Sequence, residues 1–274
     1  MITIIAIICI YLYIIKPNRK IKDRTRKIQL FIEKPVAHRG LYLVNKDGLE
    51  DYPENSLPSF KRAVEYGLGI ELDVRLTKDN KLVVFHDKTL KRMCGVNRKV
   101  SNRTYRELMR YSLLETSYKI PTFRQVINEV NGDAPLLIEV KADKHTIKTT
   151  KILLKQLQNY GGPFVIESFS PFALIYLRIF APEIIRGQLV SDHIKGKKIN
   201  SLMDIILNGM LLNFISKPDF IASNHKYVNK LKYKIMRKLY DYWAAGWTIK
   251  SEEELEKAKK TFDIIIFDGF IPKK

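Results

Sequence analysis

The sequence lacks the features that mark secreted, repetitive or disulfide-stabilised proteins. Its 274 residues include only two cysteines, Cys9 in an apolar leader and Cys94 in a polar stretch, and these provide no disulfide framework. We find no internal repeat of about 20 to 50 residues and no low-complexity tract, which excludes a repeat architecture. The N-terminus also lacks the basic start and small-residue cleavage site of a secretory signal. These absences favour free thiols in a reducing compartment and one ordinary domain.

Acidic residues are scarce relative to basic ones. The chain has 29 Asp and Glu against 48 Lys and Arg, which gives a net charge of +19. Nucleic acid is one partner that such a charge would attract, but no nucleic-acid-binding motif accompanies it. The densest basic cluster directly follows the apolar leader: Lys16, Arg19, Lys20, Lys22, Arg24, Arg26 and Lys27. This position favours an anionic membrane surface over nucleic acid as the partner.

The leader itself, residues 1–15, carries no charge and is mostly isoleucine. A helix over these residues would reach about 22 Å. That is short of the roughly 30 Å hydrocarbon core of a bilayer, although Tyr11, Tyr13 and Lys16 could extend the span. We therefore expect an uncleaved membrane anchor.

This expectation divides the chain into three parts. Residues 1–18 are predicted to be a transmembrane anchor, residues 19–34 a basic juxtamembrane linker, and residues 35–274 a single folded domain. Because clusters of Lys and Arg stay on the cytoplasmic side of a membrane, we predict a single-pass protein of the cell membrane with its domain in the cytoplasm.

Apolar, β-branched runs alternate with helical patterns through the predicted domain. The strand-like runs cover 35–39, 69–75, 82–86, 135–141, 163–168, 184–190, 219–223, 242–249 and 263–268. The helical patterns cover 55–66, 121–131, 145–159, 171–180, 199–215, 226–240 and 251–261. Asp79-Asn80 predicts a two-residue hairpin turn, which joins the second and third runs into one extended strand and pairs Asp73 with His86. Eight strands that alternate with helices predict an α/β fold, the (β/α)8 TIM barrel, with its active site at the carboxyl ends of the strands.

Charged residues stand at the ends of several of these strands, although the strands are apolar around them. They are His38, Arg39, Glu71, Asp73, His86, Glu139 and Lys141. One carboxylate in a strand usually marks a solvated edge or a salt bridge, but four strand ends of this kind favour a shared site. Carboxylate oxygens suit a hard divalent cation such as Mg²⁺ or Ca²⁺, whereas Arg and Lys suit a phosphate. The set indicates metal-assisted chemistry on a phosphate ester.

An ordered series of short motifs resembles the glycerophosphodiester phosphodiesterase family. The motifs are His38-Arg39-Gly40, Pro53-Glu54-Asn55-Ser56, Glu71-Leu72-Asp73-Val74, Val83-Val84-Phe85-His86-Asp87, Ile120-Pro121-Thr122, Glu139-Val140-Lys141, Glu167-Ser168-Phe169 and Trp247-Thr248. The match runs from about Pro35 to Asp268. Two departures, Ile249-Lys250 where the family usually has Val-Asn and Phe267 where a Thr is common, bear on substrate choice more than on reaction type.

The resemblance implies metal-dependent hydrolysis of glycerophosphodiesters to glycerol 3-phosphate and an alcohol. The site residues that it implies fall into four groups: Glu71, Asp73 and Glu139 as ligands of one Mg²⁺ or Ca²⁺; Arg39 and Lys141 as phosphate-binding residues; His38 and His86 as the general acid and base pair; and Glu54, Asn55 and Trp247 as supporting residues. The remaining histidines, His145, His193 and His225, have no ligand partner at useful spacing and are predicted to be solvated.

Two other functions stay open at this point. The chain could be a phospholipase-type phosphodiesterase that acts on lysophospholipids or intact lipids, as some members of the wider superfamily do. It could also be an inactive membrane-anchored module that binds lipid or phosphate. The presence of both histidines and all three carboxylates speaks against the inactive module.

Overall fold

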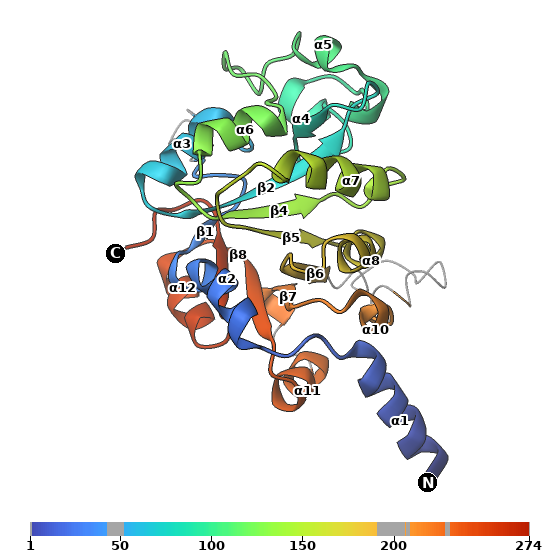
Figure 1. Cartoon of the computed structure of the whole chain (residues 1–274). Coiled ribbons are helices and arrows are strands. Elements are labelled where there is room, and N and C mark those ends of the chain that lie inside the picture. Colours follow the sequence, from blue (N-terminus) through green and yellow to red (C-terminus); the bar gives the residue numbers. More distant parts are fainter. Residues whose placement is uncertain (1, 43–51, 191–205, 207–208, 228–230, 274) are drawn as a thin grey trace.

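The computed structural model describes residues 2–42, 52–190, 206, 209–227 and 231–273. Its strands are β1 (Val36–Ala37), β2 (Gly69–Leu76), β3 (Leu82–Val84), β4 (Leu136–Val140), β5 (Phe164–Ser168), β6 (Arg186–Val190), β7 (Phe220–Asn224), β8 (Trp243–Ile249) and β9 (Ile264–Phe267). Their order is β1-β9-β8-β7-β6-β5-β4-β2-β3, and an additional β1–β2 pairing closes the sheet into a barrel of eight parallel strands (Figure 1). Only β3 runs antiparallel to its neighbour among the described strands. The predicted (β/α)8 barrel is confirmed.

Helices alternate with the strands and cover the outside of the barrel (Figure 1). They are α1 (Ile2–Ile15), α2 (Lys22–Glu33), α3 (Leu57–Glu65), α4 (Lys91–Cys94), α5 (Tyr105–Leu108), α6 (Phe123–Val130), α7 (Thr146–Leu157), α8 (Pro171–Phe180), α10 (Asn213–Ser216), α11 (Leu231–Leu239) and α12 (Glu252–Lys259). Six of the predicted helices are confirmed within a few residues, as α3, α6, α7, α8, α11 and α12. Most of the predicted helix at 199–215 lies outside the described residues.

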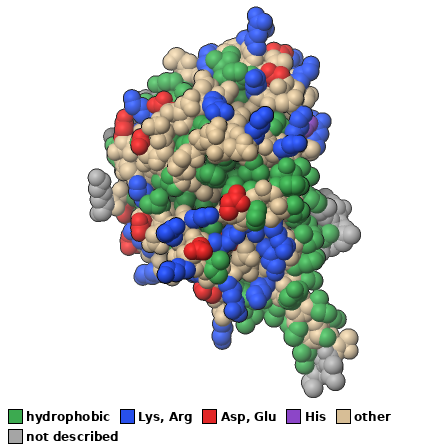
Figure 2. All heavy atoms as spheres, viewed as in Figure 1, with side chains coloured by type: hydrophobic (Ala, Val, Ile, Leu, Met, Phe, Trp, Pro, Cys, Tyr) green, Lys and Arg blue, Asp and Glu red, His purple; other side chains and the backbone are tan. Residues whose placement is uncertain are grey.

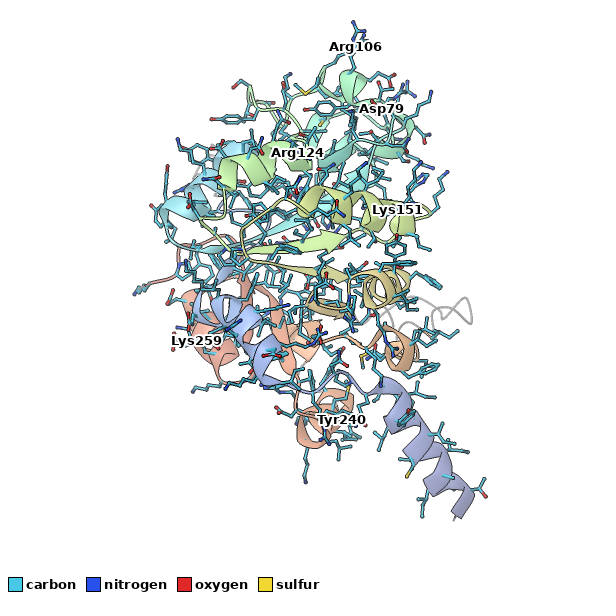
Figure 3. All side chains as sticks on the ribbon, viewed as in Figure 1. Asp79, Arg106, Arg124, Lys151, Tyr240 and Lys259 are labelled. Carbon is cyan, nitrogen blue, oxygen red and sulfur yellow. The ribbon has the colours of Figure 1, made fainter. Side chains whose placement is uncertain are left out.

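The β2–β3 hairpin differs from the prediction by one residue. Its observed register is Val74↔Val84, Arg75↔Val83 and Leu76↔Leu82. The loop has three residues rather than two, because Asn80 adopts a left-handed conformation with φ of 59° and Thr77 pairs with Lys81 across the loop at 3.0 Å. Asp79, labelled in Figure 3, accepts from the Tyr105 amide at the start of α5. The predicted pairing of Asp73 with His86 is therefore wrong: the amide of Phe85 donates to the Asp73 carbonyl at 2.9 Å.

The inside of the barrel has an apolar floor. The buried residues of this floor are Val36, Leu137, Val165, Ile185, Phe220, Trp243, Ile264 and Ile266. Helix α2 closes the floor from below, because its Ile28 and Phe31 are fully buried against the same residues. Two residues of the predicted linker, Ile28 and Phe31, therefore belong to the barrel core.

Cations of the basic segment are engaged by the amino-terminal end of the barrel. Lys20 Nζ lies 3.2 Å from Asp263 Oδ1, and Lys27 Nζ donates to the Glu183 carbonyl at 2.9 Å. Arg24 forms an ion pair with the fully buried Asp219. Figure 2 shows Lys and Arg side chains gathered on this side of the molecule. Part of the segment's charge thus attaches α2 to the barrel.

Helix α1 extends away from the barrel (Figures 1 and 2) and is attached only at its last turns among the described residues. Tyr240, labelled in Figure 3, donates to the Leu12 carbonyl at 2.7 Å, and Asn213 donates to that of Ile15 at 3.0 Å.

The prediction of a transmembrane anchor is wrong. Within the part of the chain that the structure describes, no helix combines the length and the apolar character that a bilayer crossing requires. Helix α1 ends after 14 residues, and at about 1.5 Å per residue such a helix falls short of the roughly 30 Å hydrocarbon core. This finding overturns the anchor at 1–18 and the single-pass localisation in the cell membrane with a cytoplasmic domain.

Candidate active site

A polar layer lies above the apolar floor, at the carboxyl ends of the strands. Asp73 on β2, Glu139 on β4 and Glu167 on β5 are direct neighbours in the sheet register, so their side chains form one row inside the barrel. Glu139 and Glu167 border a cavity of about 320 Å³, which is lined by His38, Arg39, Glu71, His86, Glu139, Lys141, Glu167, Phe169, Leu189, Trp247, Thr248 and Ile266. The closed barrel thus brings the predicted metal-binding, phosphate-binding and histidine residues into one place.

Three buried carboxylates face one another at the centre of this layer. Glu71, Asp73 and Glu139 each offer an oxygen, and these oxygens lie within 4.8 Å of one another. Burial, together with repulsion from Asp73 and Glu139, raises the pKa of Glu71 well above its usual range. Burial also raises the pKa of Glu139. Ionisation of all three carboxylates together is therefore disfavoured unless a further cation joins them.

Lys141 and Arg39 provide the cations of the cluster. Lys141 Nζ lies 2.8 Å from Asp73 Oδ1 and 2.8 Å from Glu139 Oε1. Burial alone would raise the pKa of Asp73, but the charges of Lys141, His86 and Arg39 lower it well below its usual range. Asp73 is thus the carboxylate of the cluster that stays ionised most readily.

A tight turn after β1 places Arg39 against the carboxylates. Arg39 and Gly40 have φ of 59° and 83°, and a Cβ on Gly40 would lie 2.4 Å from Ser59 Oγ. The turn aims the Arg39 amide at Glu71 Oε2, at 2.8 Å, while the guanidinium donates to Glu54 at 2.9 Å. The glycine of the His-Arg-Gly motif is therefore required for the position of the arginine.

Each histidine of the cavity is held by a carboxylate through its Nδ1 atom. His38 Nδ1 lies 3.2 Å from Asp268 Oδ2, and His86 Nδ1 lies 2.7 Å from Asp87 Oδ1. With Nδ1 protonated, each ring donates to its carboxylate and keeps Nε2 for a ligand in the cavity. Burial lowers the pKa of both His38 and His86. The contact with the carboxylate therefore fixes the orientation of each ring and leaves its Nε2 atom available to a ligand.

The predicted supporting residues also lie at the site. Asn55 Nδ2 donates to Asp73 Oδ2 at 2.7 Å, and Glu54 accepts from Arg39. Trp247 packs edge-on against Phe169, with 6.0 Å between ring centroids. All ten residues named from the sequence are therefore close to the cavity, whereas their roles stay predictions.

Sequence reasoning missed Glu167 and Asp268 as site residues. Glu167 lies near the carboxyl end of β5, as Glu139 does in β4, and Asp268 directly follows β9. This position at a strand end was the signal that could have identified them. Glu167 is buried, and burial together with the charge of Glu139 raises its pKa well above the usual range. Asp268 accepts from Tyr42 as well as contacting His38, both at 3.2 Å.

The other histidines do not enter the site where they are described. His145 precedes α7. His225 lies 3.8 Å from Glu254 of α12, and its side chain is only 15% exposed, so it is less solvated than predicted. His193 lies outside the described residues.

Comparisons with known proteins agree with this geometry. Residues 46–268 match the Glycerophosphoryl diester phosphodiesterase family. A glycerophosphodiester phosphodiesterase of Caldanaerobacter subterraneus subsp. tengcongensis is 32% identical over 166 residues, which cover 56% of this chain and 65% of that protein. A human lysophospholipase D is 34% identical over 145 residues, which cover 48% of this chain and 44% of that protein. The chain thus spans less than two thirds of either relative.

A solved structure shares the fold. The phosphodiesterase of Oleispira antarctica in complex with the product sn-glycerol-3-phosphate superimposes with a TM-score of 0.70 at 22% identity, covering 86% of this chain and 92% of that one. This likeness supports the barrel assignment. Since the family match extends over most of the sequence and the residues that carry its motifs converge on one cavity, the chain belongs to the glycerophosphoryl diester phosphodiesterase family.

Proposed function

We propose that this chain hydrolyses glycerophosphodiesters to sn-glycerol 3-phosphate and an alcohol, with the help of a divalent cation. The observation that carries the proposal is the convergence of three buried carboxylates, two cations and two carboxylate-held histidines on one cavity. Family membership and the product complex of the related structure support it.

The carboxylate cluster suits a hard divalent cation. Glu71, Asp73 and Glu139 offer only oxygen atoms, at mutual distances that one ion can span. Burial, and then repulsion from Asp73 and Glu139, raises the pKa of Glu71 well above its usual range, and a cation bound between the carboxylates would relieve the repulsion. When bound, Mg²⁺ or Ca²⁺ would polarise the phosphoryl group as a Lewis acid.

Arg39 and Lys141 would bind and neutralise the phosphate. Lys141 is buried beside the carboxylates, the Arg39 side chain is only 15% exposed, and both residues line the cavity. Charge that develops on phosphoryl oxygens is stabilised most by donors already held in place. The Arg39–Glu54 and Lys141–Glu139 contacts provide that fixed geometry.

His38 and His86 would act as the general acid and base pair. Each has Nδ1 directed to a carboxylate, so each can exchange a proton at Nε2 with a group in the cavity. One ring would remove a proton from the attacking oxygen, and the other would protonate the departing alcohol oxygen.

Product analysis tests this function. Purified protein is incubated with glycerophosphocholine, glycerophosphoethanolamine and glycerophosphoglycerol, either with added Mg²⁺ or Ca²⁺ or with EDTA. We expect glycerol 3-phosphate to appear only with a divalent cation. Phosphate binding without turnover on any substrate would instead support the inactive module.

A lysophospholipase D activity is the second candidate. The human relative carries that name, and the cavity combines its charged groups with the apolar surfaces of Phe169, Leu189 and Trp247. Lysophosphatidylcholine and a diacyl phosphatidylcholine in the same assay distinguish the two candidates, because lysophosphatidic acid or phosphatidic acid would replace glycerol 3-phosphate as product.

We also propose that the protein acts at a lipid surface, which does not require a helix that crosses the membrane. Helix α1 exposes apolar side chains such as Ile4, which is 64% exposed, and Ile7, at 61%. Sedimentation with anionic and zwitterionic vesicles tests peripheral contact, with a chain that lacks residues 1–15 as the control. Equal sedimentation of both chains would exclude α1 from lipid contact.

A further inference from the structure

We propose that Arg92 is a positioning residue for both halves of the site, fixing the phosphate-binding Arg39 through Glu54 and the acid–base His86 through Asp87. This inference rests on the proposed function. Arg92 belongs to α4, which lies in the segment between β3 and α6 and outside the regular alternation of strands and helices.

The guanidinium of Arg92 bridges two carboxylates. Its Nη1 and Nη2 atoms each donate to an oxygen of Glu54 at 2.7 Å, and its Nε donates to Asp87 Oδ2 at 2.8 Å. A planar fork of this kind gives fixed geometry as well as charge, and three hydrogen bonds leave little freedom to the side chain.

Each carboxylate passes the restraint on to a residue of the cavity. Glu54, whose side chain is 5% exposed, accepts from Arg39 Nη1 at 2.9 Å. Asp87 uses its second oxygen, Oδ1, to hold His86 Nδ1 at 2.7 Å. The chain of contacts therefore runs from one guanidinium to a phosphate-binding group on one side and to an imidazole on the other.

Arg92 does not take the role of Arg39 itself. It is absent from the described residues that line the cavity, and its nitrogens are occupied by Glu54 and Asp87. Its effect on the reaction would thus be indirect.

The backbone of α4 is anchored well enough to serve as the fixed point. Leu90 and Met93, on either side of Arg92, are buried in a separate apolar cluster of this segment. That cluster also contains Val83 and Phe85 of the β3 region, next to His86 in sequence. The segment therefore attaches to the barrel through packing and reaches the cavity through Arg92.

Without Arg92, Glu54 and Asp87 would each lose a charged partner while staying largely enclosed. Two carboxylates without the cation between them would also repel each other, and both Arg39 and His86 would lose their fixed orientation. Displacement of a reacting group by about 1 Å can cost on the order of a hundredfold in rate.

The test compares Arg92→Gln and Arg92→Lys with a matched control, Arg103→Gln. Arg103 lies in the same segment and forms an ion pair with Glu107 at 3.1 Å, away from the cavity lining. We expect Arg92→Gln to lower kcat by about ten- to a hundredfold, the usual effect of removing a group that orients a site residue. Arg92→Lys should recover only part of the rate, because one ammonium group cannot bind both oxygens of Glu54 and also donate to Asp87 with the geometry of a guanidinium. Arg103→Gln should stay within about twofold of the wild type.

Double-mutant cycles separate the two branches. Glu54→Gln should raise KM and lower kcat, whereas Asp87→Asn should lower kcat with little effect on KM. Either change combined with Arg92→Gln should cost much less than the product of the single effects. Fully multiplicative losses in both cycles would overturn the proposal.

A measurement without turnover keeps the inference distinct from the proposed function. The ¹⁵N NMR signals of the imidazole rings report the hydrogen bond at Nδ1. In Arg92→Gln or, should that variant not fold, in Arg92→Lys, we expect the His86 signals to shift and the His38 signals to stay. Inactive wild-type protein with this selective shift would refute the proposed function alone, and unchanged His86 signals would refute the role of Arg92.

Discussion

The two ends of the barrel bury acidic residues in opposite ways. At the amino-terminal end, Asp219 is fully buried, but its Oδ1 accepts from Asn18 at 2.7 Å and its Oδ2 from the Arg186 amide at 3.0 Å. Arg24 adds an ion pair. At the carboxyl-terminal end, Glu71, Asp73 and Glu139 crowd together with fewer cations than carboxylates.

The difference shows how to tell a structural acid from a ligand-binding one. An acid whose oxygens all have partners gains nothing from a further ligand, and it fastens α2 to the barrel. Acids that repel one another, such as Glu71 and its neighbours, gain from any cation that enters. Burial alone does not distinguish the two, whereas the number of partners does.

Removal of the cation or of Asp73 should have the largest effect on activity. We expect EDTA to abolish hydrolysis and Asp73→Asn to lower kcat by about a thousandfold or more, because charge stabilisation at the phosphoryl group is lost. Steady-state assays with Mg²⁺, Ca²⁺ or Mn²⁺ added back measure this. Glu253→Gln, at an exposed ion pair on α12, is the control. Full turnover by metal-free protein would remove the carboxylate cluster from the mechanism.

The corresponding change at the other end should affect stability instead. Asp219→Ala leaves the cations of Arg24 and Arg186 without their shared partner, and loss of one member of a buried pair costs about 3 kcal/mol. Urea unfolding of both proteins at pH 7 measures the cost, while kcat should stay within about twofold. If Asp219→Ala keeps the wild-type free energy of unfolding but loses turnover, Asp219 would be a functional acid rather than a structural one.

Single histidine substitutions should have a smaller effect than loss of the cation. We expect His38→Ala and His86→Ala each to lower kcat by about a hundredfold, the usual contribution of general acid or base catalysis. His145→Ala and His225→Ala should be nearly silent. Wild-type rates in a folded His38→Ala or His86→Ala variant would take that ring out of the mechanism.

The sequence predicted the carboxyl-terminal end of the barrel much better than the amino-terminal end. Strand periodicity and strand-end charges sufficed for the barrel and for placing His38, Glu71, Asp73 and Glu139 together, because parallel strands in a barrel must bring their ends to one rim. The hairpin register failed by one residue, since local turn chemistry at Asn80 decides it.

Residues 1–34 were misread for a physical reason. An apolar run followed by Lys and Arg is typical of a membrane anchor, and the pattern carries no information about partners far away in sequence. The contacts that fold this segment join Lys20 to Asp263 and Arg24 to Asp219, which are separated by about 200 residues or more. Glu167 and Asp268 escaped notice for a related reason, because their importance comes from neighbours on other strands.

The smallest effect that we predict is a gain in stability when Glu71 loses its charge. It compares the two ends of the barrel most directly, because loss of a structural acid such as Asp219 should lower stability instead. Glu71 has a raised pKa, so its stabilising contribution is present below the pKa of an unfolded glutamate and is lost as pH rises through the raised value. Metal-free Glu71→Gln should therefore be more stable than the wild type at pH 8, by about 1 kcal/mol, the common scale of a stabilising substitution. The advantage should shrink toward pH 4. The amide oxygen of the glutamine can still accept from the Arg39 backbone, so this contact is preserved.

Saturating Mg²⁺ should invert the order of the two proteins. A cation that binds only the folded state stabilises it in proportion to the logarithm of its concentration, and the wild type would gain more from it than Glu71→Gln. Thermal unfolding at pH 8 with and without Mg²⁺ measures both effects, and Asp219→Asn serves as the contrast because it should destabilise under both conditions. If Glu71→Gln is less stable than the wild type without metal, then Glu71 is a structural acid like Asp219. The proposed distinction between the two ends of the barrel would then be wrong.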